Sequence, residues 1–291
     1  MTTLTPRKPY TEDEIRQLYP DGLQLQLVQI LMRHGERTPV SARFQNTGLA
    51  PFWPYCANVR QLKAAVLAHG GDLTTLEWKR RLETFGPNDQ PVIAAGPNGQ
   101  VDDVCDMGSL TDTGRQTTYK LGLRLRDLYI NRLRFLPETL TSTESLYLRA
   151  TPIPRALESM QQTFSALYPP SARKPDETGR FTTPMILTRA PSDETLFPND
   201  SNCRRFAQLS RAFAQRAADR WNTTEDMEYL NKLLGKWMPP DRPRIGVDSR
   251  PRLSGVMDVS SFPQAPFSPL ADIPTDRECD RRPWASNETT F

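Results

Sequence analysis

The sequence predicts an α/β protein, because short apolar runs alternate along the chain with segments of helical periodicity. The apolar runs span residues 23–32, 145–151 and 184–190, and the periodic segments begin near Ser109, Pro154 and Cys203. This alternation favours βαβ units with a parallel-rich sheet over a sandwich or a barrel. Charged residues end the first two runs, and the binding sites of such sheets gather at the carboxyl ends of strands.

Composition indicates a soluble globular protein. The chain has 291 residues, of which 37% are hydrophobic and 24% charged, and its net charge of +3 is too small to indicate a nucleic-acid partner. Its four cysteines lie far apart without a C-x-x-C pair, which argues against a zinc site and leaves disulfides open. No apolar run has membrane-spanning length, and the N-terminus lacks the apolar core of a secretory signal. We therefore expect a cytoplasmic protein.

The first part of the chain is predicted to lead into one buried strand. Residues 1–22 are polar, whereas residues 23–32, LQLQLVQILM, alternate and then become fully apolar. A glycine and a proline shortly afterwards end that strand. Residues 40–107 give mixed signals, and the stretch NVRQLKAAVLAHGG within them predicts a helix that Gly70 and Gly71 close.

The middle of the chain carries the clearest helix signals. Thr111 is a candidate N-cap, and Asp112 lies in the first turn of the helix that follows. Pro154 suits the first turn of a second helix. Leucines at helical spacing define one face of the first helix, namely Leu121, Leu125 and Leu128. The predicted buried stripe of the second helix consists of Leu157, Met160, Phe164 and Leu167.

Short strands and further helices complete the pattern. One short strand within residues 145–151 ends at Arg149, and another is predicted within residues 184–190. Residues 203–236 are expected to form two helices. Residues 259–291 are interrupted by prolines and keep no apolar period, so we predict a mostly disordered tail.

The segment RHGERTP, residues 33–39, brings charge to the end of the first predicted strand. Arginine forks suit phosphate oxygens, so Arg33 and Arg37 are candidate phosphate ligands, and Gly35 leaves room for a ligand near the backbone. Two positive neighbours should depress the pKa of His34 and keep it neutral and nucleophilic. These residue types suit phosphoryl transfer through a phosphohistidine. The alternative is a solvated charged turn, which an isolated R-H-G would favour.

The segment RHGERTP resembles the signature of the histidine acid phosphatases, branch 2 of the histidine phosphatase superfamily. GSLTDTGRQTTYKLGLRLRDLY, YLRATPIPRALESMQQTF and DETLFPNDSNC are similar to further stretches of that family. Within the family, the sequence of these stretches is most similar to the lysophosphatidic acid phosphatase type. The resemblance predicts a histidine phosphatase domain over residues 23–258, incomplete at its C-terminus, with a lead-in over 1–22 and the tail over 259–291.

The resemblance implies a phosphoglycerate mutase-like three-layer αβα fold with a mostly helical region inserted after the first strand. It also implies that His34 is the nucleophile and that Arg33, Arg37 and Arg149 bind phosphate, with no metal and no cofactor. Arg155 could add a positive charge, although an arginine in such a helical position more often faces solvent.

One departure from the family concerns the general acid that protonates the leaving group. The family takes this acid from a late His-Asp pair, and this chain has no such pair and no histidine after His69. We interpret His69 as a polar residue near a helix C-terminus. Asp72, Asp193 and Glu194 are stand-in acids only if the fold brings one of them to His34; Glu36 lies at a variable position of the motif. The general acid therefore stays unknown.

The resemblance implies a metal-independent phosphomonoesterase, an acid phosphatase-type hydrolase, acting on lysophosphatidic acid or a similar small phosphate monoester. The alternative is a catalytically impaired phosphate-binding pseudophosphatase, or a truncated gene product, that lacks the general acid. Inositol polyphosphate hydrolysis is a weaker reading, because it needs many more basic side chains, and a mutase is the weakest. The resemblance also admits a mitochondrial location, and it leaves the oligomeric state open.

Overall fold

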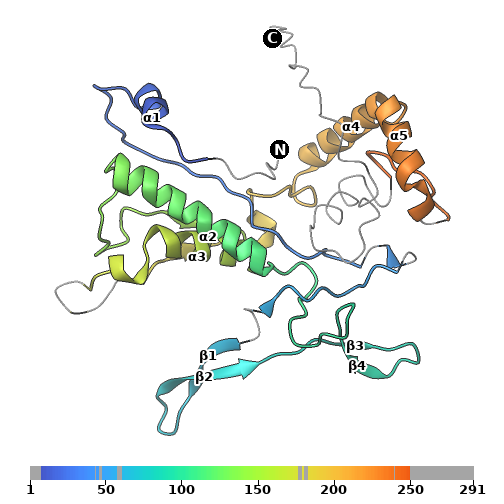
Figure 1. Ribbon diagram of the computed structural model, residues 1–291, viewed down its shortest axis with the longest axis horizontal. Coiled ribbons are helices and arrows are strands. Elements are labelled where there is room, and N and C mark those ends of the chain that lie inside the picture. Colours follow the sequence, from blue (N-terminus) through green and yellow to red (C-terminus); the bar gives the residue numbers. More distant parts are fainter. Residues whose placement is uncertain are drawn as a thin grey trace. The chain divides into compact units, whose positions relative to one another are not determined.

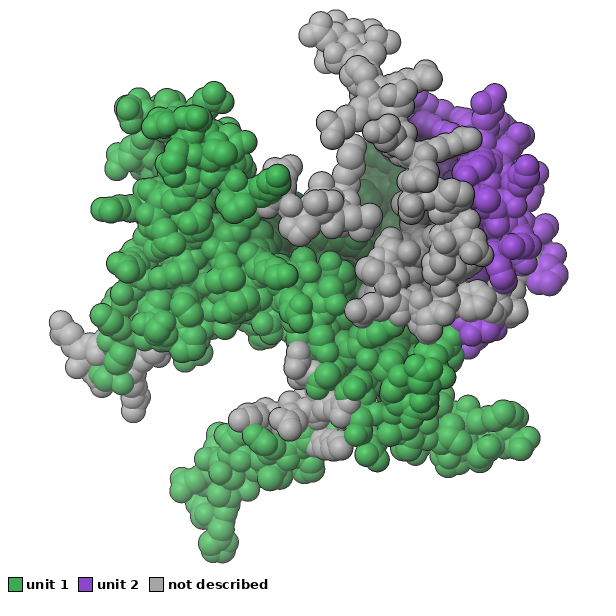
Figure 2. All heavy atoms as spheres, in the orientation of Figure 1, with its two compact units in different colours: residues 1–42, 50–212 green, residues 43–49, 213–291 purple. Residues whose placement is uncertain are grey.

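The computed structural model describes residues 8–42, 44–45, 48–57, 61–175, 179, 183–238 and 240–249. The chain divides into two compact units (Figure 2). The first comprises residues 1–42 and 50–212, and the second comprises residues 43–49 and 213–291. The predicted tail over 259–291 lies outside the described residues.

The polar lead-in contains a short helix, α1 (Glu12–Leu18). A capping box starts it: the Glu14 N–H donates to Thr11 Oγ1 at 3.2 Å, and the Thr11 N–H donates to Glu14 Oε2 at 2.7 Å. Arg132 Nη2 lies 2.6 Å from Glu12 Oε1, so an ion pair ties α1 to the segment around Arg132. The lead-in therefore has structure of its own.

The strand predicted over residues 23–32 is not formed. Leu23, Leu27 and Leu31 are 74%, 70% and 84% exposed. Within the described ranges, residues 23–36 pair with no strand, and a lone bridge joins Arg37 to Leu110. An alternating apolar segment becomes a buried strand only where neighbouring strands satisfy its backbone and cover its faces, and the described residues supply neither here.

Two antiparallel hairpins occupy the region after the motif (Figure 1). Their strands are β1 (Gln61–Leu67), β2 (Leu73–Lys79), β3 (Glu83–Phe85) and β4 (Pro91–Ile93). The predicted helix closed by Gly70 and Gly71 is therefore wrong, and so is a mostly helical insertion, since the described part of residues 40–107 contains no α-helix. The run LKAAVL fits either period, and Gly70 (φ 95°) and Gly71 (φ 91°) close a hairpin turn instead of a helix.

Two long helices of the first unit pack against each other (Figure 1): α2 (Asp112–Arg126), which continues as the π-helix η3 (Asp127–Arg132), and α3 (Pro154–Leu167). The predicted N-cap Thr111 is confirmed, since its Oγ1 accepts from the Gly114 N–H at 3.1 Å. Pro154 begins α3 as predicted.

Close backbone contact joins the two helices. A Cβ added to Gly122 of α2 would lie 2.1 Å from the Thr163 carbonyl oxygen of α3, so only glycine permits this approach. The fully buried residues of α3 are Ser159, Thr163 and Ala166. The predicted apolar stripe of α3 is only half-buried, because Thr163 and Ala166 face α2 instead.

Strands β5 (Leu148–Arg149) and β6 (Ile186–Leu187) pair in parallel, which confirms both predicted strands and their parallel sense. The described residues form three separate two-stranded sheets and no larger central sheet. Beside α3, a core cluster gathers Ile130, Leu140, Tyr168 and Ala172. The 3₁₀ turns η4 (Pro170–Ala172) and η5 (Pro191–Asp193) connect these elements.

The two helices predicted within residues 203–236 are confirmed as α4 (Arg204–Trp221) and α5 (Glu225–Leu234), followed by η6 (Gly235–Trp237). Thr224 caps α5 through the Met227 N–H. In the second unit, Met227, Met238 and Ile245 form a small apolar core. None of the helices in the described ranges is long and apolar enough to cross a bilayer.

Candidate active site

The RHGERTP motif is held by the first turns of α2 and by α3. The Gly35 N–H donates to Ser159 Oγ at 3.1 Å, and the Thr111 N–H donates to the Glu36 carbonyl at 2.9 Å. A Cβ on Gly35 would lie 2.3 Å from the Gly114 carbonyl oxygen. The room that Gly35 provides is therefore taken by the backbone of α2, which corrects the expectation that a ligand uses it.

His34 is half-buried, and its tautomer follows from one hydrogen bond. Nδ1 lies 2.7 Å from the Gly35 carbonyl oxygen. A carbonyl can only accept, so Nδ1 carries the proton and Nε2 keeps its lone pair. That ring nitrogen is thereby prepared to act as a nucleophile.

The pKa of His34 is lowered below its ordinary value of 6.5, and burial is the largest cause. The Gly35 carbonyl acts in the opposite direction. Three positive charges lower the pKa of His34 further, those of Arg155, Arg33 and Arg37. The lowered pKa favours the neutral imidazole, which is the direction that the sequence predicts, although burial contributes more than the arginines on which that prediction rested.

The arginines around His34 differ in their surroundings. Arg33 is exposed, whereas Arg37 is half-buried and donates from Nη1 to the Thr38 carbonyl at 2.9 Å. Arg155 is also half-buried, and its Nη1 donates to the Gly108 carbonyl at 3.4 Å. Sequence reasoning discounted Arg155, although its positive charge lowers the pKa of His34.

Arg149 lies at the end of β5 as predicted, but it is paired with a carboxylate. Its Nη2 is 2.5 Å from Oε1 of Glu194, which is only 1% exposed. The same oxygen accepts the N–H groups of Thr195 and Leu196 at 2.7 and 2.8 Å. These contacts fix Arg149 between its strand and the turn that follows η5.

Glu194 is poorly suited to act as the missing general acid. Burial by itself raises its pKa, but the Leu196 and Thr195 N–H groups and the charge of Arg149 outweigh burial, and the net pKa is lowered from 4.5. Asp193, Asp72 and Glu36 are exposed. His69 is exposed in the turn between β1 and β2, so the helix C-terminus expected for it is absent there.

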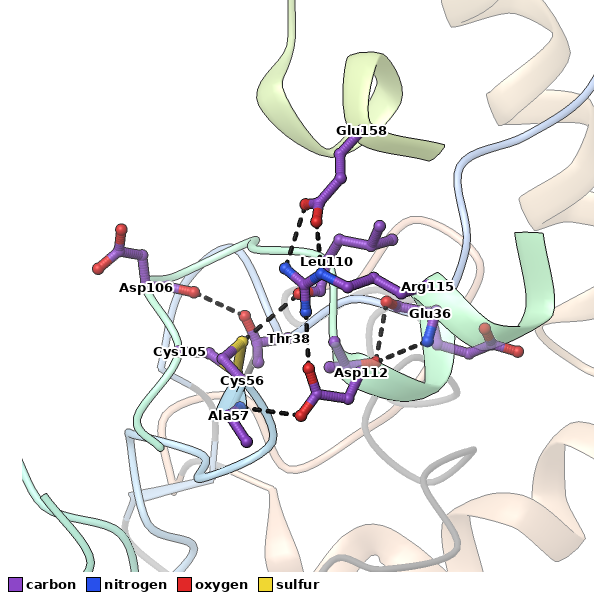
Figure 3. The surroundings of a disulfide bond; sticks show 12 residues. Glu36, Thr38, Cys56, Ala57, Cys105, Asp106, Leu110, Asp112, Arg115 and Glu158 are labelled. Carbon is purple, nitrogen blue, oxygen red and sulfur yellow. Dashed lines mark hydrogen bonds and ion pairs between the residues drawn. A yellow bond between two sulfur atoms is a disulfide. The ribbon is translucent and has the colours of Figure 1, made fainter. Parts of the chain in front are cut away.

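A disulfide secures the loop beside the motif (Figure 3). Cys56 and Cys105 are joined across 49 residues, a pairing that separated cysteines could not reveal in sequence. Thr38 Oγ1 donates to the Asp106 carbonyl at 2.8 Å, directly after the disulfide. Cys203 is free and exposed.

An ion-pair network fixes the start of α2 beside that disulfide, as Figure 3 shows. The buried Arg115 donates to Asp112 Oδ1 at 2.9 Å and to Glu158 Oε2 of α3 at 3.1 Å. The Ala57 N–H donates to the other oxygen of Asp112 at 2.8 Å. The described residues contain no group of histidines, cysteines and carboxylates that could hold a metal ion.

The family model for the histidine phosphatase superfamily, branch 2, matches residues 24–241. The chain therefore belongs to this superfamily.

Relatives with known names agree with this membership. A probable acid phosphatase of Schizosaccharomyces pombe, SPBC4.06, is 39% identical over 83% of this chain and 50% of its own length. Counting factor 60 of Dictyostelium discoideum is 29% identical over 88% of this chain and 56% of its own length. Human lysophosphatidic acid phosphatase type 6 is 26% identical over 73% of this chain and 45% of its own length. The chain thus spans about half the length of the curated relatives it matches.

Proposed function

We propose that this chain acts as a metal-independent phosphomonoesterase of the acid phosphatase type, through a phosphohistidine at His34. The single observation that carries the proposal is the hydrogen bond from Nδ1 to the Gly35 carbonyl, which leaves the lone pair on Nε2. A half-buried, neutral imidazole surrounded by guanidinium groups is suited to attack a phosphoryl group. Membership of the branch 2 superfamily supports the same reaction.

The reaction has two displacements at phosphorus. In the first, the lone pair of Nε2 forms a P–N bond while the ester P–O bond breaks, and the leaving alkoxide takes a proton from solvent water, since no side chain is assigned as the general acid. In the second, water attacks phosphorus, the P–N bond breaks, and inorganic phosphate leaves with His34 restored. We assign Arg33, Arg37 and Arg149 to the phosphoryl oxygens, where their charges stabilise the transition state.

The substrate is proposed to be a small phosphate monoester, with lysophosphatidic acid as the first candidate. Two relatives support this choice, since one is named a probable acid phosphatase and another a lysophosphatidic acid phosphatase. The phosphoglycerate mutase-like three-layer arrangement belongs to the same proposal, because the chain is a member of that superfamily.

A phosphate-binding pseudophosphatase is the second candidate, and one observation favours it. The chain contains no His-Asp pair, and the buried Glu194 has a lowered pKa that keeps it ionised. Without a proton donor, an alkoxide leaves slowly, at a cost of roughly two to four powers of ten in rate. Nitrophenolate needs no such proton, so the leaving group separates the two candidates.

The proposed cytoplasmic location meets one contrary observation. A disulfide such as Cys56–Cys105 persists mainly in oxidising compartments and is rare in the cytosol. Thiol titration of the chain isolated from its native compartment, with alkylation before lysis, decides between an oxidising compartment and the cytosol.

The test is a steady-state assay of the full chain on p-nitrophenyl phosphate and on lysophosphatidic acid at mildly acidic pH. His34→Ala should abolish turnover of both, whereas His69→Ala, the matched control, should leave it unchanged. Turnover of nitrophenyl phosphate alone supports the pseudophosphatase. Equal and measurable turnover by wild type and His34→Ala would contradict both candidates.

A further inference from the structure

Ser159 is a fully buried serine on the face of α3 that packs against the motif, and its side chain is bonded on two sides. Its residue is only 1% exposed. The hydroxyl donates its proton to the Arg155 carbonyl, one helical turn earlier, at 2.7 Å. A hydroxyl has one proton and two lone pairs, so the oxygen remains free to accept. The Gly35 N–H donates to that oxygen at 3.1 Å, across 124 residues of sequence.

This bond fastens the backbone of His34 to the helices. Among the described residues, the peptide group that joins His34 to Gly35 makes no hydrogen bond other than the one to Ser159. The segment before the motif gives little support, because residues 23–32 pair with no strand in the described ranges. The position of His34 relative to α3 therefore depends on the Ser159 hydroxyl.

The conformation of Gly35 decides which nitrogen of His34 carries the proton. The Gly35 carbonyl oxygen lies 2.7 Å from Nδ1 of the ring. Glycine is the residue with the widest conformational freedom, so contacts on both sides must fix the direction of this carbonyl. Ser159 holds the peptide before Gly35. On the other side, Thr111 donates to the Glu36 carbonyl from its N–H at 2.9 Å and from its hydroxyl at 3.1 Å.

We propose that Ser159 is a positioning residue for the nucleophile: its hydroxyl holds the His34–Gly35 peptide so that the Gly35 carbonyl keeps the proton on Nδ1 and the lone pair on Nε2. The inference rests on the proposed function of His34 and adds a residue that acts through His34. An attacking nitrogen must lie in line with the P–O bond that breaks, and a displacement of about 1 Å costs on the order of a hundredfold in rate. A serine that served packing alone would affect stability and leave the ring of His34 unchanged.

The first test reads the ring of His34 in the full chain, without substrate. Nitrogen NMR distinguishes protonated from unprotonated ring nitrogens, and the chain has two histidines, so the exposed His69 serves as the reference. In neutral solution, wild type should carry the proton on Nδ1. Ser159→Ala should give a mixture of both tautomers at His34 and leave His69 unchanged. A single, unchanged tautomer in Ser159→Ala would overturn the proposal.

Thr163→Val is the matched control, because Thr163 lies one turn further along α3 and is also buried, at 7% exposed. Its hydroxyl donates to the Ser159 and Thr118 carbonyls at 2.9 and 3.1 Å, so its removal also costs buried hydrogen bonds. Toward the motif, the described contact of this hydroxyl is with Met32 Sδ at 3.7 Å. We expect Thr163→Val to lose stability and to keep the wild-type tautomer of His34. If it mixes the tautomers as much as Ser159→Ala, general loosening of α3 explains the result and the proposal fails.

The second test is steady-state turnover of p-nitrophenyl phosphate by the same variants. Ser159→Ala should lower kcat roughly tenfold to a hundredfold and change KM by less than about threefold, because the phosphate-binding charges are retained. Ser159→Cys keeps the size of the side chain with a weaker acceptor, so it should lie between wild type and Ser159→Ala in kcat and in tautomer mixture. The cysteine variant also tests the proposal if the alanine variant does not fold. A wild-type tautomer and a wild-type kcat in Ser159→Cys would then overturn it.

Failure of this inference is distinguishable from failure of the proposed function, because the NMR measurement needs no turnover. If Ser159→Ala mixes the tautomers while no form of the chain hydrolyses phosphate esters, Ser159 positions His34 in a protein without that activity. If wild type turns over and Ser159→Ala changes neither kcat nor the tautomer, the phosphatase stands and Ser159 is not a positioning residue.

Discussion

Residues 23–32 and the RHGERTP motif that follows them differ in burial in the opposite sense to the one that their compositions suggest. The apolar segment is exposed, and part of the charged motif is buried. Leu31 is 84% exposed, whereas Thr38, seven residues later, is 3% exposed. The difference lies in backbone partners, since the motif bonds to Ser109, Thr111 and Ser159, and residues 23–32 pair with no strand in the described ranges. A polar segment is buried where its N–H and C=O groups are satisfied, and an apolar one stays exposed where nothing covers it.

The largest expected effect comes from opening the disulfide that braces the motif. Cys56→Ser releases a loop of 49 residues, and chain entropy alone predicts a loss of about 4 kcal/mol in the free energy of unfolding. Urea denaturation with and without reductant measures this loss of stability, and the reduced wild type should match the variant. Equal stability of oxidised and reduced wild type would show that the Cys56–Cys105 disulfide is not formed.

Gly35→Ala disrupts the packing of the motif on α2. The added Cβ would meet the Gly114 carbonyl at 2.3 Å, so the motif and α2 must separate. We expect a loss of roughly 1–3 kcal/mol in the free energy of unfolding, typical of overpacking. Phosphate binding should weaken as well, because the same shift displaces His34. Unchanged stability would mean that the motif does not pack on α2.

The Arg149–Glu194 pair predicts a pH dependence of stability. The pKa of Glu194 is lowered in the folded state, so the unfolded state binds the proton more readily, and the stabilisation present above the ordinary value of 4.5 is lost as pH falls through the lowered pKa. Glu194→Gln removes this titration, and its unfolding free energy should fall less steeply below pH 4.5 than that of wild type. If the unfolding free energies of wild type and Glu194→Gln fall in parallel below pH 4.5, the lowered pKa of Glu194 is contradicted.

The smallest expected effect comes from a substitution in residues 23–32, which pair with no strand in the described ranges. Leu31→Ser changes a side chain that is 84% exposed, and we expect the free energy of unfolding to shift by less than about 0.5 kcal/mol. Thermal and urea unfolding measure this against the Gly35→Ala variant. A loss of 2 kcal/mol or more, of the size expected for a buried leucine, would show that residues 23–32 are covered in solution.

Local signals in the sequence predicted the elements that depend on local chemistry. Thr111 and Pro154 marked the starts of α2 and α3, and the short apolar runs marked β5 and β6. Prediction failed where the outcome depends on distant partners. The run that became β1 fits two periods, and no sequence pattern states whether residues 23–32 find neighbouring strands.

The candidate site divides in the same way. The residue types of the motif predicted a neutral His34 among arginines, and the lowered pKa of His34 agrees. Three features of the site bring together residues that are far apart in sequence. They are the ion pair of Arg149 with Glu194, the effect of the Arg155 charge on His34, and the disulfide. Only the folded chain reveals such contacts.

The most direct test of the central claim is to trap the phosphoenzyme. The full chain is mixed with p-nitrophenyl phosphate, quenched in alkaline denaturant within milliseconds, and digested for mass spectrometry. The account predicts a phosphoryl group on the peptide that contains His34, stable to base, lost in acid, and absent from His34→Ala. Turnover of nitrophenyl phosphate without any phosphorylated His34, or phosphorylation of another residue, would contradict it.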